Sequence, residues 1–167
     1  MRTILSGGLT VMLFGFAGCQ SPPARSEKVT PLMVRFYLEA RPGETTVEVQ
    51  LPQSGVLLGV APKPVFSEYD IVNAEVARVE LGLCLLVQLS PSASRDLYCL
   101  SVPAQGRRLV LALNGVCLGV HRIEQAMSDG TVPVFLEVPD EQLPGIVHQI
   151  KLASTTMARS PDQTAKK

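Results

Sequence analysis

The sequence predicts an α+β fold: a mostly antiparallel sheet built from hairpins, with two or three helices packed on one face. Three observations lead to this prediction. Residues 31–40 alternate apolar and polar side chains, as a half-buried strand does. The dipeptide Asn114-Gly115 lies between two apolar runs and is the strongest two-residue hairpin signal in the chain. Ser90 and Pro91 open a helix directly after a strand, and hairpins followed by helices are typical of this class.

The first half of the folded region is predicted to be mostly strand. Its expected elements are, in chain order, a hairpin of residues 31–40 and 45–51, an apolar run at 56–60, a helical turn at 68–73, and a hairpin with strands from about 75 and at 83–89. The last hairpin competes with a helix, because several of its valines also recur at helical spacing. Gly82 favours the hairpin, since glycine weakens a helix interior.

The second half combines helices with strands. Its expected elements are, in chain order, a helix from 90 that stops near 103, a hairpin of strands 107–113 and 116–120, a helical segment at 123–127, a turn at 128–130, a strand at 131–138, and a final helix from 139 to about 153. Ala93, Leu97 and Leu100 recur at i, i+4 and i+7 and form the buried face of the first helix. Pro133 has no N–H for a ladder and predicts an edge position for its strand.

The first nineteen residues are typical of an export signal. Arg2 supplies a positive charge, and residues 4–16 are uncharged and mostly apolar. The small residues Ala17 and Gly18 follow, directly before Cys19. This apolar run is shorter than the roughly 20 residues that a membrane-spanning helix needs, so we expect a cleaved leader of residues 1–18.

The ending Phe16-Ala17-Gly18-Cys19 resembles the bacterial lipobox, with Phe16 in place of the usual Leu. The resemblance implies that Cys19 becomes the mature N-terminus and carries a diacylglycerol and a further acyl chain such as palmitate. Several acyl chains hold a small protein at a bilayer, since each buried methylene contributes about 0.8 kcal/mol. The alternative is a plain secretory leader followed by an incidental cysteine.

The rest of the chain divides into a tether, one domain and a tail. Residues 19–29 are polar and contain two prolines, which predicts a flexible tether in the cell envelope. Residues 30–153 have the size of one domain, and residues 154–167 form a polar tail that we expect to be disordered. Gln20 is not the Asp that usually retains a lipoprotein at the inner membrane, so the resemblance favours the outer membrane, facing the periplasm.

The charge balance argues against nucleic acid as a partner. The chain has 15 basic and 15 acidic residues, and removal of the leader takes away only Arg2, which leaves 14 minus 15, or −1. Nucleic-acid binding depends on clustered Lys and Arg, and the pair Arg107-Arg108 is too small a patch.

The cysteines and histidines do not form a recognisable metal site. Cys84, Cys99 and Cys117 lie outside any CxxC or CxxH pattern. Cys84 and Cys117 stand in very apolar surroundings and are expected to be small buried hydrophobes. One disulfide among the three stays open, because an oxidising compartment permits it. His121 and His148 have no carboxylates at ligand spacing, so no metal and no cofactor are predicted.

No catalytic motif is present either. The sequence contains no G-x-S-x-G, no phosphate-binding loop and no HExxH. Nucleophilic catalysis needs a Ser, Cys or Thr beside a base, and no such pattern emerges. The sequence therefore predicts a protein that is not an enzyme. An enzyme of an unrecognised class, with a site assembled from dispersed residues, is the alternative.

A series of local signals follows one order along the second and third quarters of the chain. They are Asp70-Ile71 with Ala74, a strand and helix cap at 85–90 with Ala93 and Leu97, Gly106-Arg107-Arg108-Leu109 leading to Asn114-Gly115, and the segment 123–130. Over residues 60–138 this order is similar to the periplasmic head region of SecD, the accessory subunit of the protein-export machinery. The sequence departs from that family at Gly119-Val120-His121, where the family has a small residue followed by Ala and Pro.

The SecD resemblance implies an envelope protein that binds exported polypeptides or other envelope proteins. Because the sequence lacks the membrane-spanning remainder of SecD, we expect no proton-driven motor. Two surfaces are candidates for binding: an open edge of the sheet, and a loop formed by Gly119, Val120, His121 and Arg122. The other hypothesis is a structural envelope lipoprotein without a defined ligand.

Overall fold

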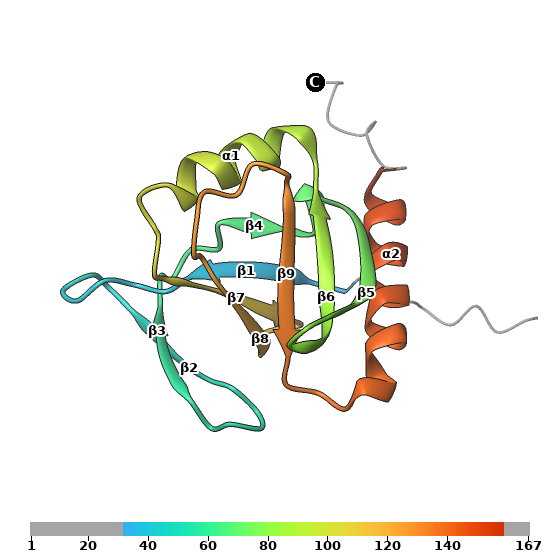
Figure 1. Cartoon of the computed structure of the whole chain (residues 1–167), viewed down its shortest axis with the longest axis horizontal. Helices are drawn as coiled ribbons and strands as arrows, with labels where there is room; N and C mark the ends of the chain where they lie inside the picture. Colours follow the sequence, from blue (N-terminus) through green and yellow to red (C-terminus); the bar gives the residue numbers. More distant parts are fainter. Residues whose placement is uncertain (1–31, 159–167) are drawn as a thin grey trace, which may run out of the picture.

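The structure, a computed structural model, describes residues 32–158 and has the predicted α+β fold. One curled, antiparallel sheet of seven strands forms its centre, with two helices and a separate two-stranded ribbon around it (Figure 1). The strands of the sheet are, in the order in which they lie side by side, β4 (Phe66–Ser67), β1 (Val34–Leu38), β7 (Arg108–Leu113), β8 (Val116–Arg122), β9 (Thr131–Leu136), β6 (Gly82–Leu89) and β5 (Ile71–Val79).

Two helices and two 3₁₀ turns accompany the sheet. Helix α1 (Pro91–Ser101) follows β6, and helix α2 (Leu143–Ala158) packs along β5 (Figure 1). The 3₁₀ turns η1 (Glu68–Asp70) and η2 (Asp140–Gln142) precede β5 and α2. The ribbon consists of β2 (Val47–Gln50) and β3 (Leu57–Val60).

The main hydrophobic core lies between the sheet and the helices. Both helices contribute to it, α1 through Ala93 and Leu97 and α2 through Ile150 and Ala153, so they cover the same face, as predicted. The side chains of the sheet that are fully buried there include Val34, Phe36, Leu85, Val87, Leu109, Leu111, Val132 and Val134. On the opposite face a smaller cluster packs under the ribbon: Leu51, Leu58, Val60, Val110, Ala112 and Cys117.

Several local predictions are confirmed. The hydroxyl of Ser90 accepts the N–H of Ala93 at 3.3 Å, so it caps α1 as expected. Asn114 and Gly115 both have positive φ angles, 49° and 84°, which is the conformation of a two-residue type I′ hairpin between β7 and β8. Gly82 has φ 121° at the turn of the β5–β6 hairpin, a conformation that a helix would not allow.

The predicted hairpin of residues 31–40 and 45–51 is wrong. Strand β1 pairs with β4 and β7, whereas β2 pairs with β3. The reason is burial: β1 places Val34 and Phe36 in the main core, whereas β2 is largely exposed. Strand β1 therefore lies inside the main sheet, and β2 pairs with β3, the next apolar run in the chain. A single bridge, Glu39 to Val60, connects the two regions.

The predicted helix at 123–127 is also wrong, because neighbouring segments take up its backbone groups. The N–H of Ile123 donates to the Arg107 carbonyl oxygen at 2.9 Å, and its own carbonyl accepts from Gly106 at 2.7 Å. The N–H of Met127 donates to the hydroxyl of Ser101 at 2.9 Å. The segment is therefore an extended loop that follows β8.

Three boundaries and one strand position differ from prediction. The helical turn expected at 68–73 ends at Asp70, and β5 begins at Ile71 rather than near 75. Helix α2 continues to Ala158, so residues 154–158 belong to it and not to a tail. Strand β9 lies between β8 and β6, not at an edge.

The leader, the lipidation site Cys19 and the tether lie outside the described residues. Within residues 32–158, neither helix combines the length and the apolar character that crossing a bilayer requires.

Candidate functional site

The residues predicted to form a binding loop belong to a strand. Gly119, Val120, His121 and Arg122 form the second half of β8, and the loop prediction is wrong. The strand extends this far because β7 continues to pair with it, up to Arg108 opposite Arg122. The ladder on the other side of β8 is much shorter.

That difference opens the sheet between β8 and β9. The two strands pair only at Gly119 with Leu136 and at Val120 with Phe135. Beyond this point β8 stays with β7, and β9 stays with β6. A hollow of about 740 Å³ lies over the opening. We call it the β8–β9 hollow. Its lining residues are Val79, Leu81, Val120, His121, Arg122, Glu124, Gln125, Ala126, Met127, Ser128, Asp129, Thr131, Pro133 and Phe135.

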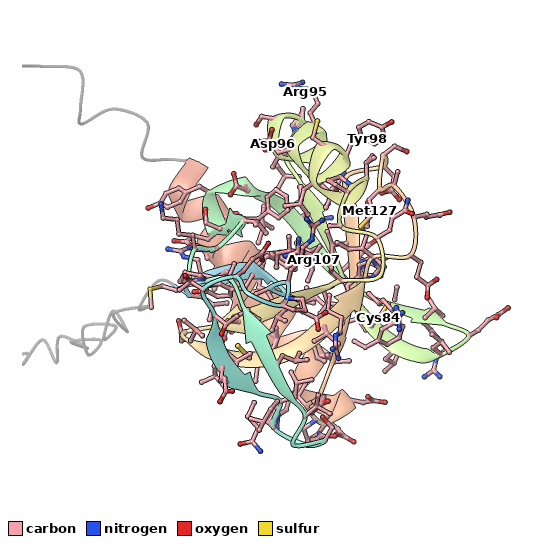
Figure 2. All side chains as sticks on the ribbon, turned by 90° about the vertical axis from the view of Figure 1, so that its left-hand side faces the viewer. Cys84, Arg95, Asp96, Tyr98, Arg107 and Met127 are labelled. Atoms are coloured by element: carbon pink, nitrogen blue, oxygen red, sulfur yellow. The ribbon has the colours of Figure 1, made fainter. Side chains whose placement is uncertain are left out.

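Three segments build this hollow. Alternate residues of β9, namely Thr131, Pro133 and Phe135, face it, while the residues between them face the core. The loop that follows β8 forms one side, and the tip of the β5–β6 hairpin adds Val79 and Leu81. In Figure 2 this hairpin and the loop bearing Met127 lie on the same side of the molecule.

Apolar side chains dominate two parts of the hollow and remain accessible there. Leu81, at the hairpin tip, is 83% exposed, and Val79 is 41% exposed. Val120, Pro133 and Phe135 are half-buried. Charged residues of both signs line the hollow around them, namely Arg122, Glu124 and Asp129. The hollow thus combines partly exposed apolar groups with a mixed polar rim.

The backbone pairing of β8 also changes at the opening. Amide groups along a strand alternate between its two neighbours. Because Ile123 donates to Arg107, the residue directly before β7, the preceding residue Arg122 turns its N–H and C=O away from β7, toward β9. The β8–β9 ladder ends at Val120, and the same register, if continued, would place Arg122 opposite Pro133, which has no N–H to donate.

His121 closes part of the gap with its side chain. Its ring hydrogen-bonds to the carbonyl oxygen of Pro133, so this oxygen points toward β8. The missing N–H of Pro133 therefore faces the same opening, where the ladder has already ended and no bond is lost. This explains how a proline fits an interior strand. Burial lowers the pKa of His121, while the bond to Pro133 and the charge of Glu124 oppose that effect.

Gly119 has a structural role beside the hollow and does not line it. A Cβ atom at this position would lie 2.3 Å from the carbonyl oxygen of Phe135 and 2.7 Å from a methyl group of Leu136. Only glycine lets β8 and β9 approach closely enough to pair here. Of the four residues singled out from the sequence, Val120, His121 and Arg122 therefore line the hollow.

The polar groups of the hollow are not arranged as a nucleophile and a base. Ser128, His121 and Asp129 all line it, but the His121 ring bonds to Pro133 and the Asp129 carboxylate accepts the N–H of Thr131 at 3.1 Å. His148 is exposed on α2. Within residues 32–158, no three His, Cys, Asp or Glu side chains come together as metal ligands.

The three cysteines of the domain are free thiols. Cys84 and Cys117 are buried, as predicted, and burial raises the pKa of both. Cys99 is exposed on α1.

The other predicted surface, an open sheet edge, is limited. One edge strand, β4, has only two residues. The other, β5, has α2 packed beside it (Figure 1). The sequence reasoning missed Val79 and Leu81, although an apolar residue directly before the turn glycine Gly82 is a signal that could have identified the hairpin tip.

Two solved structures resemble this fold. One is a structure of SecDF, a membrane component that enhances protein export: the TM-score is 0.55, with 15% sequence identity, over 72% of this chain and 62% of that chain. The second is a crystal structure of SecDF in its super-membrane-facing form: the TM-score is 0.56, with 16% identity, over 72% of this chain and 19% of that chain. The chain thus spans less than two thirds of either structure.

These matches confirm the SecD-like fold that the order of sequence signals predicted. No protein-family model and no curated protein matches the sequence.

Proposed function

We propose that this chain is a lipid-anchored protein of the cell envelope whose SecD-head-like domain binds polypeptide and is linked to protein export, without catalysing a reaction. The observation that carries the proposal is the β8–β9 hollow, where partly exposed apolar side chains lie beside the end of the β8–β9 ladder.

An extended polypeptide fits this combination. Its side chains offer apolar groups to Leu81, Val120 and Phe135, and its backbone can pair with β8 beyond the end of the ladder at Val120. A lipid or a small apolar molecule supplies only the first kind of contact. The charges around the hollow are of both signs, so they do not favour a strongly charged ligand.

The bonding of the polar groups supports binding without catalysis. The His121 ring is engaged by Pro133, and the carboxylate of Asp129 is engaged by Thr131. Because both groups already have partners, a role in contact is favoured over activation of the Ser128 hydroxyl.

The envelope location rests on the leader and on Cys19. Lipid attachment at Cys19 would keep the domain at a membrane that faces the periplasm, the outer membrane being favoured by Gln20. The test is the mass of the mature N-terminal peptide, together with membrane fractionation of the protein and of a Cys19→Ala variant. We expect an acylated Cys19 and release of the variant from membranes. An unmodified N-terminus would contradict the anchored form.

The binding role is tested by site-specific photo-crosslinking in cells. A photoreactive residue replaces Leu81 in the hollow or, as a matched control, Val102, which is 48% exposed beyond the end of α1. We expect position 81 to capture exported chains or components of the export machinery, and a Phe135→Ala change to reduce the yield. Equal yields at both positions, or none at position 81, would count against polypeptide binding and favour a purely structural lipoprotein.

A further inference from the structure

Three exposed apolar residues lie on the segments that meet where the described chain begins. Met33 is 50% exposed, Tyr69 is 68% exposed and Val116 is 56% exposed. We call these three residues the entry patch. None of them lines the β8–β9 hollow.

Backbone contacts hold the parts of the entry patch together. Met33 donates its N–H to the side-chain oxygen of Asn114 at 3.0 Å, and its carbonyl accepts the N–H of Asn114 at 2.8 Å. Val116 follows this turn directly. On the other side of β1, the N–H of Val34 donates to Glu68, the residue before Tyr69. The beginning of β1 therefore lies between η1 and the β7–β8 turn.

The carboxylates beside the entry patch are already engaged. Glu68 is buried and pairs with Arg35. Asp70 accepts both the N–H and the hydroxyl of Ser67, at 2.8 and 3.0 Å. Arg35 therefore neutralises the charge of Glu68, which leaves Asp70 as the charged carboxylate of the two beside an anionic membrane surface.

The length of the preceding chain limits how far this end lies from the lipid. Twelve residues separate Cys19 from Leu32, and even a fully extended chain of this length reaches only about 45 Å. A domain of this size has a radius of gyration near 14 Å and a diameter of roughly 36 Å, about 2.6 times that radius. The reach of the chain is therefore close to the diameter of the domain. A tethered domain of this kind experiences the bilayer at a high effective concentration, on the order of millimolar, so a small apolar patch is enough to orient it.

We infer that the entry patch rests on the phospholipid bilayer that holds the lipid anchor. This inference depends on the proposed acylation of Cys19. Tyr69 is well suited to the place, because an amphipathic ring prefers the boundary between headgroups and acyl chains. In Figure 2, β1 (blue) begins on the left, whereas the β5–β6 hairpin (green) lies on the right. With the entry patch on the bilayer, the β8–β9 hollow faces away from the lipid and is accessible to polypeptide.

The test uses fluorescence, since the chain contains no Trp. Variants Y69W and L81W each place one indole in the full, lipidated protein, the first in the entry patch and the second at the hairpin tip. Each is reconstituted into phosphatidylethanolamine–phosphatidylglycerol vesicles with and without brominated acyl chains. We expect bromine to quench the Y69W emission at least threefold more strongly than the L81W emission, with a blue shift for Y69W alone.

Flotation of the same vesicles separates the two proposals. If the protein floats with the vesicles and quenching is equally weak at both positions, the anchor is real and the docking surface is wrong. Stronger quenching of L81W would mean that the hollow faces the lipid, and would overturn the inference as well. If the protein does not float, the anchoring itself fails and the docking inference fails with it. A double variant, M33S with V116S, should lower the Y69W quenching to the level of L81W while leaving flotation intact.

Discussion

Strand β9 has two faces that are covered to different degrees. On one face, Val132 and Val134 are fully buried against the main core. On the other face, Thr131, Pro133 and Phe135 are only partly covered and line the β8–β9 hollow. The two faces belong to the same six residues, so local strand propensity does not distinguish them.

The difference arises from what lies over each face. The helices cover the first face, and burial of apolar surface there stabilises the fold by roughly 25 cal/mol per Å². The ribbon covers part of the second face, over β7 and β8, and leaves β9 free. Apolar side chains that remain exposed there contribute little to folding and are available to a partner. Substitutions on the two faces should therefore separate stability from binding.

The largest difference is expected between Leu111→Ala and Leu81→Ala. Leu111 is fully buried in the main core, so its truncation leaves a cavity and should lower the free energy of unfolding by about 2–5 kcal/mol. Leu81 is 83% exposed, and its truncation should change that free energy by less than about 0.5 kcal/mol. Urea unfolding followed by circular dichroism measures both. Similar losses for the two variants would remove the distinction between the faces.

A smaller effect is expected from Gly119→Ala, which acts at the point where the two faces meet. The added Cβ would lie 2.3 Å from the Phe135 carbonyl oxygen, so β8 and β9 must move apart. We expect a loss of about 1–3 kcal/mol in the free energy of unfolding and faster amide exchange at the paired residues. Gly145→Ala is the control, since a Cβ there meets no atom within 4 Å. Equal stability of the two variants would show that the close approach is unimportant.

Local features of the fold could be predicted from the sequence, and its long-range pairing could not. The Ser90 cap and the Asn114-Gly115 turn depend on a few adjacent residues, and both are confirmed. The first hairpin was predicted wrongly, because the choice between β7 and β2 as a partner for β1 depends on burial by distant segments. Alternation within one strand carries no information on that choice.

The candidate site was recognised in part for a similar reason. Val120, His121 and Arg122 were identified from the sequence, but as a loop. The hollow arises because β8 and β9 diverge, and that divergence involves segments nearly ten residues apart in the chain. Pro133 was the nearest sequence signal. It was interpreted as the mark of an edge strand, and this is wrong, because β9 lies between β8 and β6.

A further variant, Ser101→Ala, tests whether the loop beside the hollow is held by the core. Ser101 is fully buried, and its hydroxyl accepts the N–H of Met127 at 2.9 Å and donates to the Tyr98 carbonyl at 3.0 Å. Loss of this hydroxyl should cost about 1 kcal/mol and should increase amide exchange at Met127. Ser92→Ala, on the exposed side of α1, is the control. Unchanged exchange at Met127 would mean that the loop does not depend on this bond.

The smallest expected effect is a dependence of stability on pH that comes from His121. Burial lowers the pKa of this residue in the folded protein below its ordinary value of 6.5, so the unfolded chain binds the proton more readily. The free energy of unfolding should therefore fall as the pH decreases below 6.5. Glu39, whose pKa is lowered from 4.5 chiefly by its hydrogen bond to Arg108, should act only in a more acidic range. His121→Gln should flatten the curve between pH 6.5 and 5, whereas His148→Gln, at an exposed site, should not. Identical curves for the two variants would mean that the imidazole beside Pro133 is no more buried than an ordinary surface group, and that the hollow is open to water at its floor.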